Sequence, residues 1–157
     1  MRKLVAGAAA TLLVAACSSA QPTFSVTGAS VDPTYRCPGG ASNAPYDLHA
    51  AVEVHNGTSH AVTIESITAK MKLAAVKGSW LEKVGDLFDA GSAKFDPATV
   101  PAGSTATINA TIRSACTSGK YDSSLTSSGD YVVTMRVKTS AGTYSIAAYN
   151  HHQILAA

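Results

Sequence analysis

The chain has 157 residues, of which 12 are basic and 10 are acidic, and charged residues make up only 14% of it. A nearly neutral chain without a block of basic residues lacks the electrostatic footprint of nucleic-acid binding, so we exclude that class of partner. The abundance of serine, threonine, alanine, valine and glycine favours strands with hydroxyl-rich outer faces over long charged helices.

Residues 1–16 have the three parts of a secretory signal peptide. Arg2 and Lys3 form the charged region, an apolar stretch follows, and Val14-Ala15-Ala16 provides small residues before a cleavage site. The apolar stretch is too short to cross the hydrocarbon core of a bilayer as a helix, so we expect it to direct export and then to be removed. Removal of two of the 12 basic residues leaves 10 basic against 10 acidic residues, a formal mature charge of zero.

The cleavage site itself, Val14-Ala15-Ala16-Cys17, resembles the lipobox of bacterial lipoproteins. The resemblance implies that Cys17 becomes the first mature residue and carries acyl chains such as palmitate, which together hold a protein stably on a membrane. It also implies a location in the cell envelope, on the extracytoplasmic face of a membrane, and Ser18 is typical of lipoproteins sent to an outer membrane where one exists. Residues 17–23 would form a short tether. The alternative is an ordinary secretory signal with an incidental cysteine.

The two other cysteines, Cys37 and Cys116, belong to the exported part of the chain. Exported thiols are commonly oxidised, so we predict a disulfide between them. The competing interpretation is a blue-copper site, which needs a histidine closely after the cysteine. Because no histidine lies between Cys116 and His151, the disulfide is favoured.

Alternation of apolar and polar residues predicts strands through residues 24–157, which we expect to form one domain. In the second half of the strand that begins near His60, the apolar phase slips by one residue around Glu65 and Ser66, which predicts a bulge. The stretch Asn56-Gly57-Thr58-Ser59 predicts a tight turn before that strand. The predicted strands are 24–31, 46–54, 60–73, 106–112, 131–137 and 144–148.

The stretch between the third and fourth of these strands is less regular. Residues 75–91 lose the alternation, and Trp80-Leu81 and Leu87-Phe88 are expected to dock a short helix or a long loop against the domain. The last two strands are expected to form a hairpin around Ser140-Ala141-Gly142, with His151-His152 at the end of the final strand.

The stretch Gly129-Asp130-Tyr131-Val132-Val133 resembles the start of the penultimate strand of immunoglobulin-like domains. The chain from Val52 to Ser104 is similar to immunoglobulin-like or telokin-like domains of bacterial lipoproteins, through Asn56-Gly57-Thr58 and Pro101-Ala102-Gly103-Ser104. This resemblance implies an all-β fold, an antiparallel β-sandwich of about seven strands.

The same resemblance implies where the connections lie. It places Cys37 and Cys116 at one pole of the sandwich, together with the connections 32–45, 75–91 and 114–128, and places the tether at the opposite pole. Val133 stands where an antibody domain has its second core cysteine, and Trp80 lies outside the third strand, so an antibody-type core is excluded.

The sequence contains no Gly-x-Ser-x-Gly elbow, no phosphate-binding glycine loop and no His-Glu-x-x-His helix, so we expect neither catalysis nor a cofactor. The predicted function is therefore that of a non-catalytic binding or assembly module, with an unknown protein or glycan as its partner. The candidate anchors are aromatic residues in or near the pole connections, which could equally plug the ends of the sandwich: Tyr35, Trp80, Phe88 and Tyr121.

Metal binding through surface histidines is the alternative function. If Gly57-Thr58 is the core of a two-residue turn, His55 and His60 lie directly across from each other and could share a metal ion. A zinc site needs at least three protein ligands, and Glu53 is the nearest candidate for the third.

Overall fold

The computed structural model describes residues 23–118 and 127–156. Within them the chain forms eleven strands and no helix, so no described segment could cross a membrane as a long apolar helix. Cys17 and Tyr121 lie outside the described residues. The strands are β1 (Phe24–Val31), β2 (Thr34–Cys37), β3 (Ala44–Asn56), β4 (Val62–Lys77), β5 (Leu87–Ser92), β6 (Lys94–Asp96), β7 (Thr99–Val100), β8 (Thr105–Cys116), β9 (Ser128–Thr139), β10 (Gly142–Ala147) and β11 (His152–Ala156).

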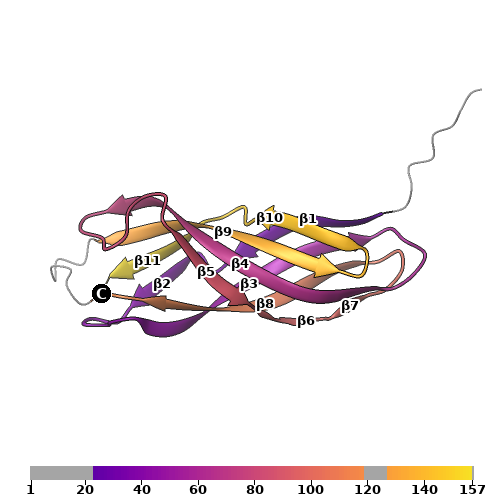
Figure 1. The fold of residues 1–157 in the computed structure, drawn as a ribbon, viewed down its shortest axis with the longest axis horizontal. Helices are drawn as coiled ribbons and strands as arrows, with labels where there is room; N and C mark the ends of the chain where they lie inside the picture. The colour runs from indigo at the N-terminus through magenta and orange to yellow at the C-terminus, as the bar shows by residue number, and fades with distance from the viewer. Residues whose placement is uncertain (1–22, 119–126, 157) are drawn as a thin grey trace, which may run out of the picture.

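The strands form two sheets that face each other (Figure 1). The first sheet has the order β1-β3-β8-β6, and the second has the order β2-β11-β9-β4-β5, with β10 beside β9 and β7 beside β4. All pairs are antiparallel except that of β2 with β11. In the usual lettering this is A-B-E-D facing G-F-C, the pairing of an immunoglobulin-like sandwich. The predicted fold class is confirmed.

The core lies between the sheets, where the alternating apolar residues meet. In β3 every second residue from Tyr46 to Val54 is buried, while Asp47, His49 and Glu53 point outward. The register of β4 against β9 shifts between Ile64 and Ser66, which is the predicted bulge. The bulge returns the apolar residues of the second half of β4 to the inner face. These are Ile67, Ala69, Met71 and Leu73.

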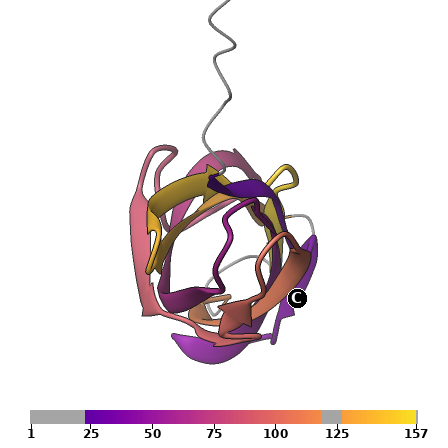
Figure 2. The ribbon, with the colours of Figure 1, turned by 90° about the vertical axis from the view of Figure 1, so that its right-hand side faces the viewer.

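Crossing segments close both sides of the sandwich, so that it looks like a ring when viewed along its long axis (Figure 2). At Asp32-Pro33 the chain passes from β1 in the first sheet to β2 in the second, and at residue 93 it passes from β5 back to β6 in the first sheet. Asn150, which lies between β10 and β11, joins the second sheet to the end of β1 on one of these sides. Its Nδ2 donates to the carbonyl of Val31 at 2.8 Å, and its Oδ1 accepts the Val31 N–H at 3.0 Å.

The connections gather at two poles. The disulfide pole contains Cys37, Cys116, the connections 38–43 and 78–86, and the end of β11; the turn pole contains residues 57–61, 97–104 and 140–141. In Figure 1 the disulfide pole is at the left, and β1 begins at the right. The cysteines thus lie at the pole opposite the start of the domain, as expected. The predicted connections 32–45 and 75–91 are shorter than expected because β2, β3, β4 and β5 occupy parts of them. Most of the predicted connection 114–128 lies outside the described residues.

The predicted tight turn at Asn56-Gly57-Thr58-Ser59 does not join two paired strands. β3 pairs with β1 and β8, whereas β4 pairs with β5, β7 and β9, so the connection between β3 and β4 crosses from one sheet to the other. The buried Asn56 side chain holds this crossing by donating to the carbonyls of His60 and Val100. The helix considered for residues 75–91 does not form. These residues comprise the end of β4, a connection and most of β5.

Candidate binding surface

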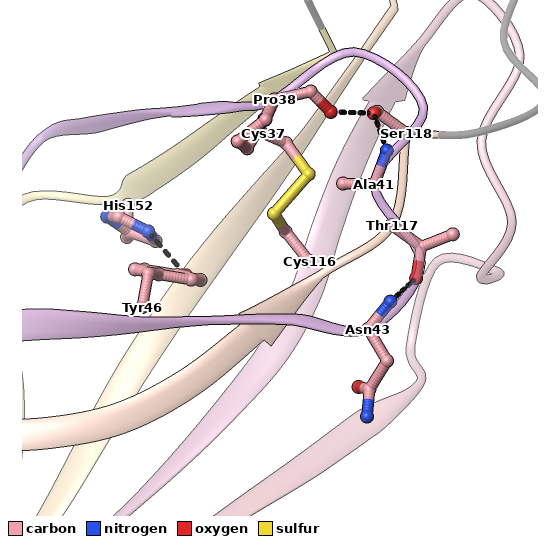
Figure 3. Close-up of a disulfide and its surroundings, with 9 residues drawn as sticks. All are labelled: Cys37, Pro38, Ala41, Asn43, Tyr46, Cys116, Thr117, Ser118 and His152. Atoms are coloured by element: carbon pink, nitrogen blue, oxygen red, sulfur yellow. Dashed lines mark hydrogen bonds between the residues drawn. A yellow bond between two sulfur atoms is a disulfide. The ribbon is translucent and has the colours of Figure 1, made fainter.

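The disulfide fixes the base of the pole. Cys37 in β2 and Cys116 in β8 are joined with their Cα atoms 5.9 Å apart, so the bond links the second sheet to the first (Figure 3). The predicted disulfide is present. Beside it, the N–H of Asn43 donates to Thr117 Oγ1 at 2.9 Å, and the N–H of Ala41 donates to Ser118 Oγ at 3.2 Å. These contacts attach the connection 38–43 to the chain that leaves β8.

Tyr35 belongs to the core beneath this pole and not to an exposed binding surface. Its ring stacks on that of Tyr46, with the ring centres 3.9 Å apart. Tyr46 in turn is hydrogen-bonded to the buried His152. Burial raises the pKa of Tyr46 to about 12 and lowers the pKa of His152, so both groups are neutral near pH 7.

Trp80 covers the open end of the core at this pole. Its indole lies against Gly129 so closely that a Cβ atom on Gly129 would be 2.5 Å from the ring. The indole N–H donates to Glu82 Oε2 at 2.8 Å and lies 3.1 Å from the Tyr131 hydroxyl, which itself donates to Glu82. Burial, followed by the hydrogen bond to Glu82, raises the pKa of Tyr131. Trp80 thus packs against the core and covers its end at this pole.

The hairpin that joins β4 to β5 exposes most of the large apolar side chains on the described surface. Five of the six large exposed apolar residues of the described chain lie within residues 76–88, which we call the apolar hairpin; the sixth is Tyr149. Leu81 and Leu87 are 70% and 68% exposed. Exposed apolar side chains that gather in one segment mark interaction sites more often than side chains scattered singly over the surface do. The five residues are Val76, Leu81, Val84, Leu87 and Phe88.

A hollow of about 280 Å³ opens beneath the apolar hairpin. Phe88 and Leu87 form part of its wall, together with Leu73 and Tyr131, and the carboxylates of Glu82 and Asp86 complete it. Asp86 already accepts the N–H of Lys83 at 2.8 Å, which fixes the hairpin's conformation at its tip. The arrangement offers apolar contact area with acceptor groups beside it, on a base held by Trp80 and the disulfide.

Two of the four predicted anchors therefore lie at this surface in different roles, since Phe88 is exposed and Trp80 is packed. Val76 and Val84 were not predicted as surface anchors, and Leu81 and Leu87 were predicted to pack against the domain. A signal was present. Apolar and polar residues alternate along the predicted strands, whereas residues 75–91 contain several apolar residues without this alternation. Such residues are not placed on one buried face, and this pattern indicates exposed apolar side chains.

The histidine pair does not have the geometry that the metal prediction required. His55 is on β3 and its Nδ1 lies 3.2 Å from Thr105 Oγ1, whereas His60 is in the crossing connection and its Nδ1 lies 2.9 Å from Ser59 Oγ. The cross-strand placement of His55 and His60 is wrong, because the residues flank a crossing between sheets. Among residues 23–118 and 127–156, no three histidine, cysteine or acidic side chains gather as potential metal ligands.

Comparison with known proteins gives only distant similarities. No protein-family model and no curated protein matches the chain. A PapD-like domain of human CEP192 is similar over 97% of this chain and 98% of its own length, with 10% identity and a TM-score of 0.34. AggA, the major subunit of aggregative adherence fimbriae type I of Escherichia coli, is similar over 84% of this chain and 94% of its own, with 12% identity and a TM-score of 0.34. At these values the similarity carries no argument, and the fold follows from the strand pairing itself.

Proposed function

We propose that this protein is a lipid-anchored, non-catalytic binding module of the bacterial cell envelope, and that it holds a partner protein through the apolar hairpin at its disulfide pole. The observation that carries the proposal is the gathering of Leu81, Val84 and Leu87 in one exposed segment, while the outer faces of both sheets are polar. Apolar side chains that project together from a rigid base are typical anchors of protein interfaces.

The position of the hairpin fits an anchored protein. If Cys17 carries acyl chains, residues 18–23 reach at most about 20 Å, which keeps the start of β1 close to the bilayer. Because β1 begins at the turn pole, the disulfide pole would point away from the membrane. An acylated Cys17 would thus present the apolar hairpin to proteins in the surrounding envelope. Where the cell has two membranes, Ser18 favours the outer one.

Site-specific photocrosslinking in intact cells tests the role of the hairpin. A photoreactive residue at Val84 should give a discrete crosslinked product, whereas one at Asn109, on the exposed face of β8, should give none. Substituting Leu81→Asp and Leu87→Asp together should abolish the product. The matched control, Thr107→Asp with Asn109→Asp, adds the same charge to the first sheet and should preserve it.

The proposal is contradicted if the product survives the paired Leu81 and Leu87 substitutions in a folded protein. Folding of each variant is verified by its thermal unfolding curve, because surface substitutions at exposed positions change stability little.

Anchoring is tested separately with Cys17→Ser. The natural chain should incorporate a palmitate analogue and sediment with membranes, whereas the Cys17→Ser variant should incorporate none. Equal labelling of the two proteins would refute acylation at this cysteine, and would leave the role of the apolar hairpin to the crosslinking experiment.

A further inference from the structure

The outer face of the second sheet carries a polar hollow that Arg136 and Lys70 help to line. We propose that this hollow binds an acidic saccharide, a sugar that carries a carboxylate, through Arg136 and Lys70 and the hydroxyl groups around them. The site lies on the outer face of the second sheet, where Asp89 follows Phe88 at the end of the apolar hairpin, and the inference does not depend on the function proposed for that hairpin.

Strand register brings the groups of this site together. Arg136 on β9 pairs with Thr68 on β4 and, across its other edge, with Ser145 on β10. Lys70 pairs with Thr134 on β9 and with Asp89 on β5. The hollow that they form measures about 440 Å³, larger than the hollow under the apolar hairpin. Its lining residues, contributed by four neighbouring strands, are Thr68, Lys70, Asp89, Thr134, Arg136 and Ser145.

Positive charge is concentrated on this face of the sheet. Lys70 and Lys72 project from β4, and Arg136 and Lys138 from β9, all of them exposed. Lys138 is 2.8 Å from Glu65, and Lys70 is 3.9 Å from Asp89. The side chain of Arg136 forms no hydrogen bond or ion pair with any residue of the described chain.

A guanidinium without a partner among residues 23–118 and 127–156 favours a carboxylate as its ligand. Its planar array of donors matches the two oxygens of a carboxylate better than a lysine ammonium does. Formally, the chain after Ala16 has no net charge, so attraction of an anion to this face requires local charge and cannot come from the protein as a whole.

The remaining lining groups point to a sugar. The hydroxyls of Thr68, Thr134 and Ser145 can each donate and accept hydrogen bonds, as the hydroxyls of a saccharide do. No aromatic or large aliphatic side chain lines the hollow, so it does not suit an acyl chain or the apolar anchor of a protein. The carboxylate of Asp89 would repel a doubly charged phosphate, but it can accept hydrogen bonds from sugar hydroxyls beside a single carboxylate.

The central strands fix the backbone positions of these residues before a ligand binds. β4 and β9 pair along most of their lengths and bury alternate side chains in the core, so the backbones that carry Thr68 and Arg136 cannot separate without opening the sandwich. Groups that are already in place lose less conformational freedom on binding, which favours recognition of a small polar ligand.

Calorimetric titration of the full chain, purified in detergent so that acyl chains are retained, tests the proposal. The probes are oligosaccharides of galacturonate and of glucuronate, neutral galactose oligosaccharides of equal length, and inorganic phosphate. We expect an acidic oligosaccharide to bind, and neither the neutral sugar nor phosphate to bind at the same concentration. Arg136→Gln should weaken binding by about tenfold or more, since a charge-assisted hydrogen-bonded pair is lost.

The test is completed by a matched control and by three outcomes that would contradict the proposal. Lys94→Gln removes one positive charge from β6 in the first sheet and should leave binding unchanged. The proposal is overturned if no acidic oligosaccharide binds, or if Arg136→Gln binds as tightly as the natural chain. Competition by phosphate at equal strength would show an anion patch without sugar recognition, and would overturn it too.

Discussion

The Nε2 atom of His152 lies 2.9 Å from the phenolic oxygen of Tyr46, inside the sandwich. Nδ1 of the same ring lies 2.7 Å from the carbonyl oxygen of Asp32, which can only accept a hydrogen bond. Nδ1 therefore carries the proton, and Nε2 accepts the hydroxyl hydrogen of Tyr46. Burial lowers the pKa of His152 and outweighs the opposite effects of the Asp32 carbonyl and of the Asp32 and Asp130 carboxylates. The neutral ring is thus part of the folded state.

We expect this histidine to make the protein less stable in mild acid. Its pKa is lower in the folded than in the unfolded chain, so the unfolded chain binds more protons below about pH 6.5. The free energy of unfolding should therefore fall as the pH drops from about 6.5 toward the folded-state pKa, by at most about 1.4 kcal/mol per pH unit for this one proton. Urea denaturation at several pH values between 7.5 and 4.5 measures the decline.

The variant His152→Gln isolates the contribution of the imidazole. It should be less stable than the natural chain at pH 7.5, because the paired hydrogen bonds to Tyr46 and Asp32 are disturbed, and the difference between the two proteins should narrow as the pH falls. A difference that stays constant across the range would refute the assignment, since other titrating groups contribute to both proteins equally.

Replacing Gly129 with alanine should expel Trp80 from the end of the core. The added methyl group would lie 2.5 Å from the indole, and Trp80 must then leave its contacts with Glu82 and Tyr131. We expect a loss of stability of about 1–3 kcal/mol, as is usual when a packed site is overfilled. Because Trp80 is the only tryptophan, its fluorescence emission should shift to longer wavelength in the folded variant.

A glycine at the turn pole provides the control for that shift. Gly103 has a φ of 66° with open space around it, so Gly103→Ala strains the backbone without touching Trp80. Gly103→Ala should lower stability and leave the emission maximum unchanged. An unshifted maximum in folded Gly129→Ala would show that Trp80 is not seated as described.

The sequence pattern predicted strands well where one face of a strand is buried. The first strand was expected at residues 24–31 and is found there, and the phase slip at Glu65 and Ser66 is a real bulge. β5 escaped prediction because it is an edge strand with nearly every side chain exposed, so that no alternation marks it. The break between β10 and β11 was missed since it depends on Asn150 reaching across to Val31, a contact between distant parts of the chain.

The sequence predicted the pole at which the candidate surface lies, but not the residues that form it. The expectation of a binding pole beside the two cysteines agrees with the position of the apolar hairpin, yet the anchors were sought among aromatic residues. Tyr35 instead stacks on the ring of Tyr46, and Trp80 packs on Gly129, where the lack of a Cβ leaves room for the indole. Exposure of Leu81 and Val84 depends on how the chain turns back at β5, and residue type alone does not decide it.

Asn56→Asp should destabilise the protein strongly at the turn pole. The Nδ2 group of Asn56 donates to the carbonyls of His60, Val100 and Pro101 at 2.8, 3.0 and 3.1 Å, and its side chain is fully buried. An aspartate carboxylate of the same shape cannot donate and would face three acceptors. We expect a loss of about 3 kcal/mol or more in urea denaturation at pH 7.

The matched substitution for Asn56→Asp is Asn109→Asp. It introduces the same charge on the exposed face of β8, where no buried carbonyl depends on the amide, and should change the free energy of unfolding by less than about 0.5 kcal/mol. Equal effects of the two substitutions would mean that the amide of Asn56 does not hold the crossing between β3 and β4.

Replacing both Cys37 and Cys116 with alanine should lower stability while the sandwich still folds. The bond closes a loop between residues 79 positions apart, which corresponds to about 4 to 5 kcal/mol if loop entropy alone is counted. Urea denaturation of the natural and doubly substituted chains measures the loss.

Both cysteines are buried, so a thiol reductant should reduce the bond much more slowly in the folded than in the unfolded chain. Trp80 and Cys116 line the same narrow crevice, and the substituted chain should therefore also show a changed Trp80 emission. Unaltered stability, together with unaltered emission, would show that the strands hold the disulfide pole without the bond.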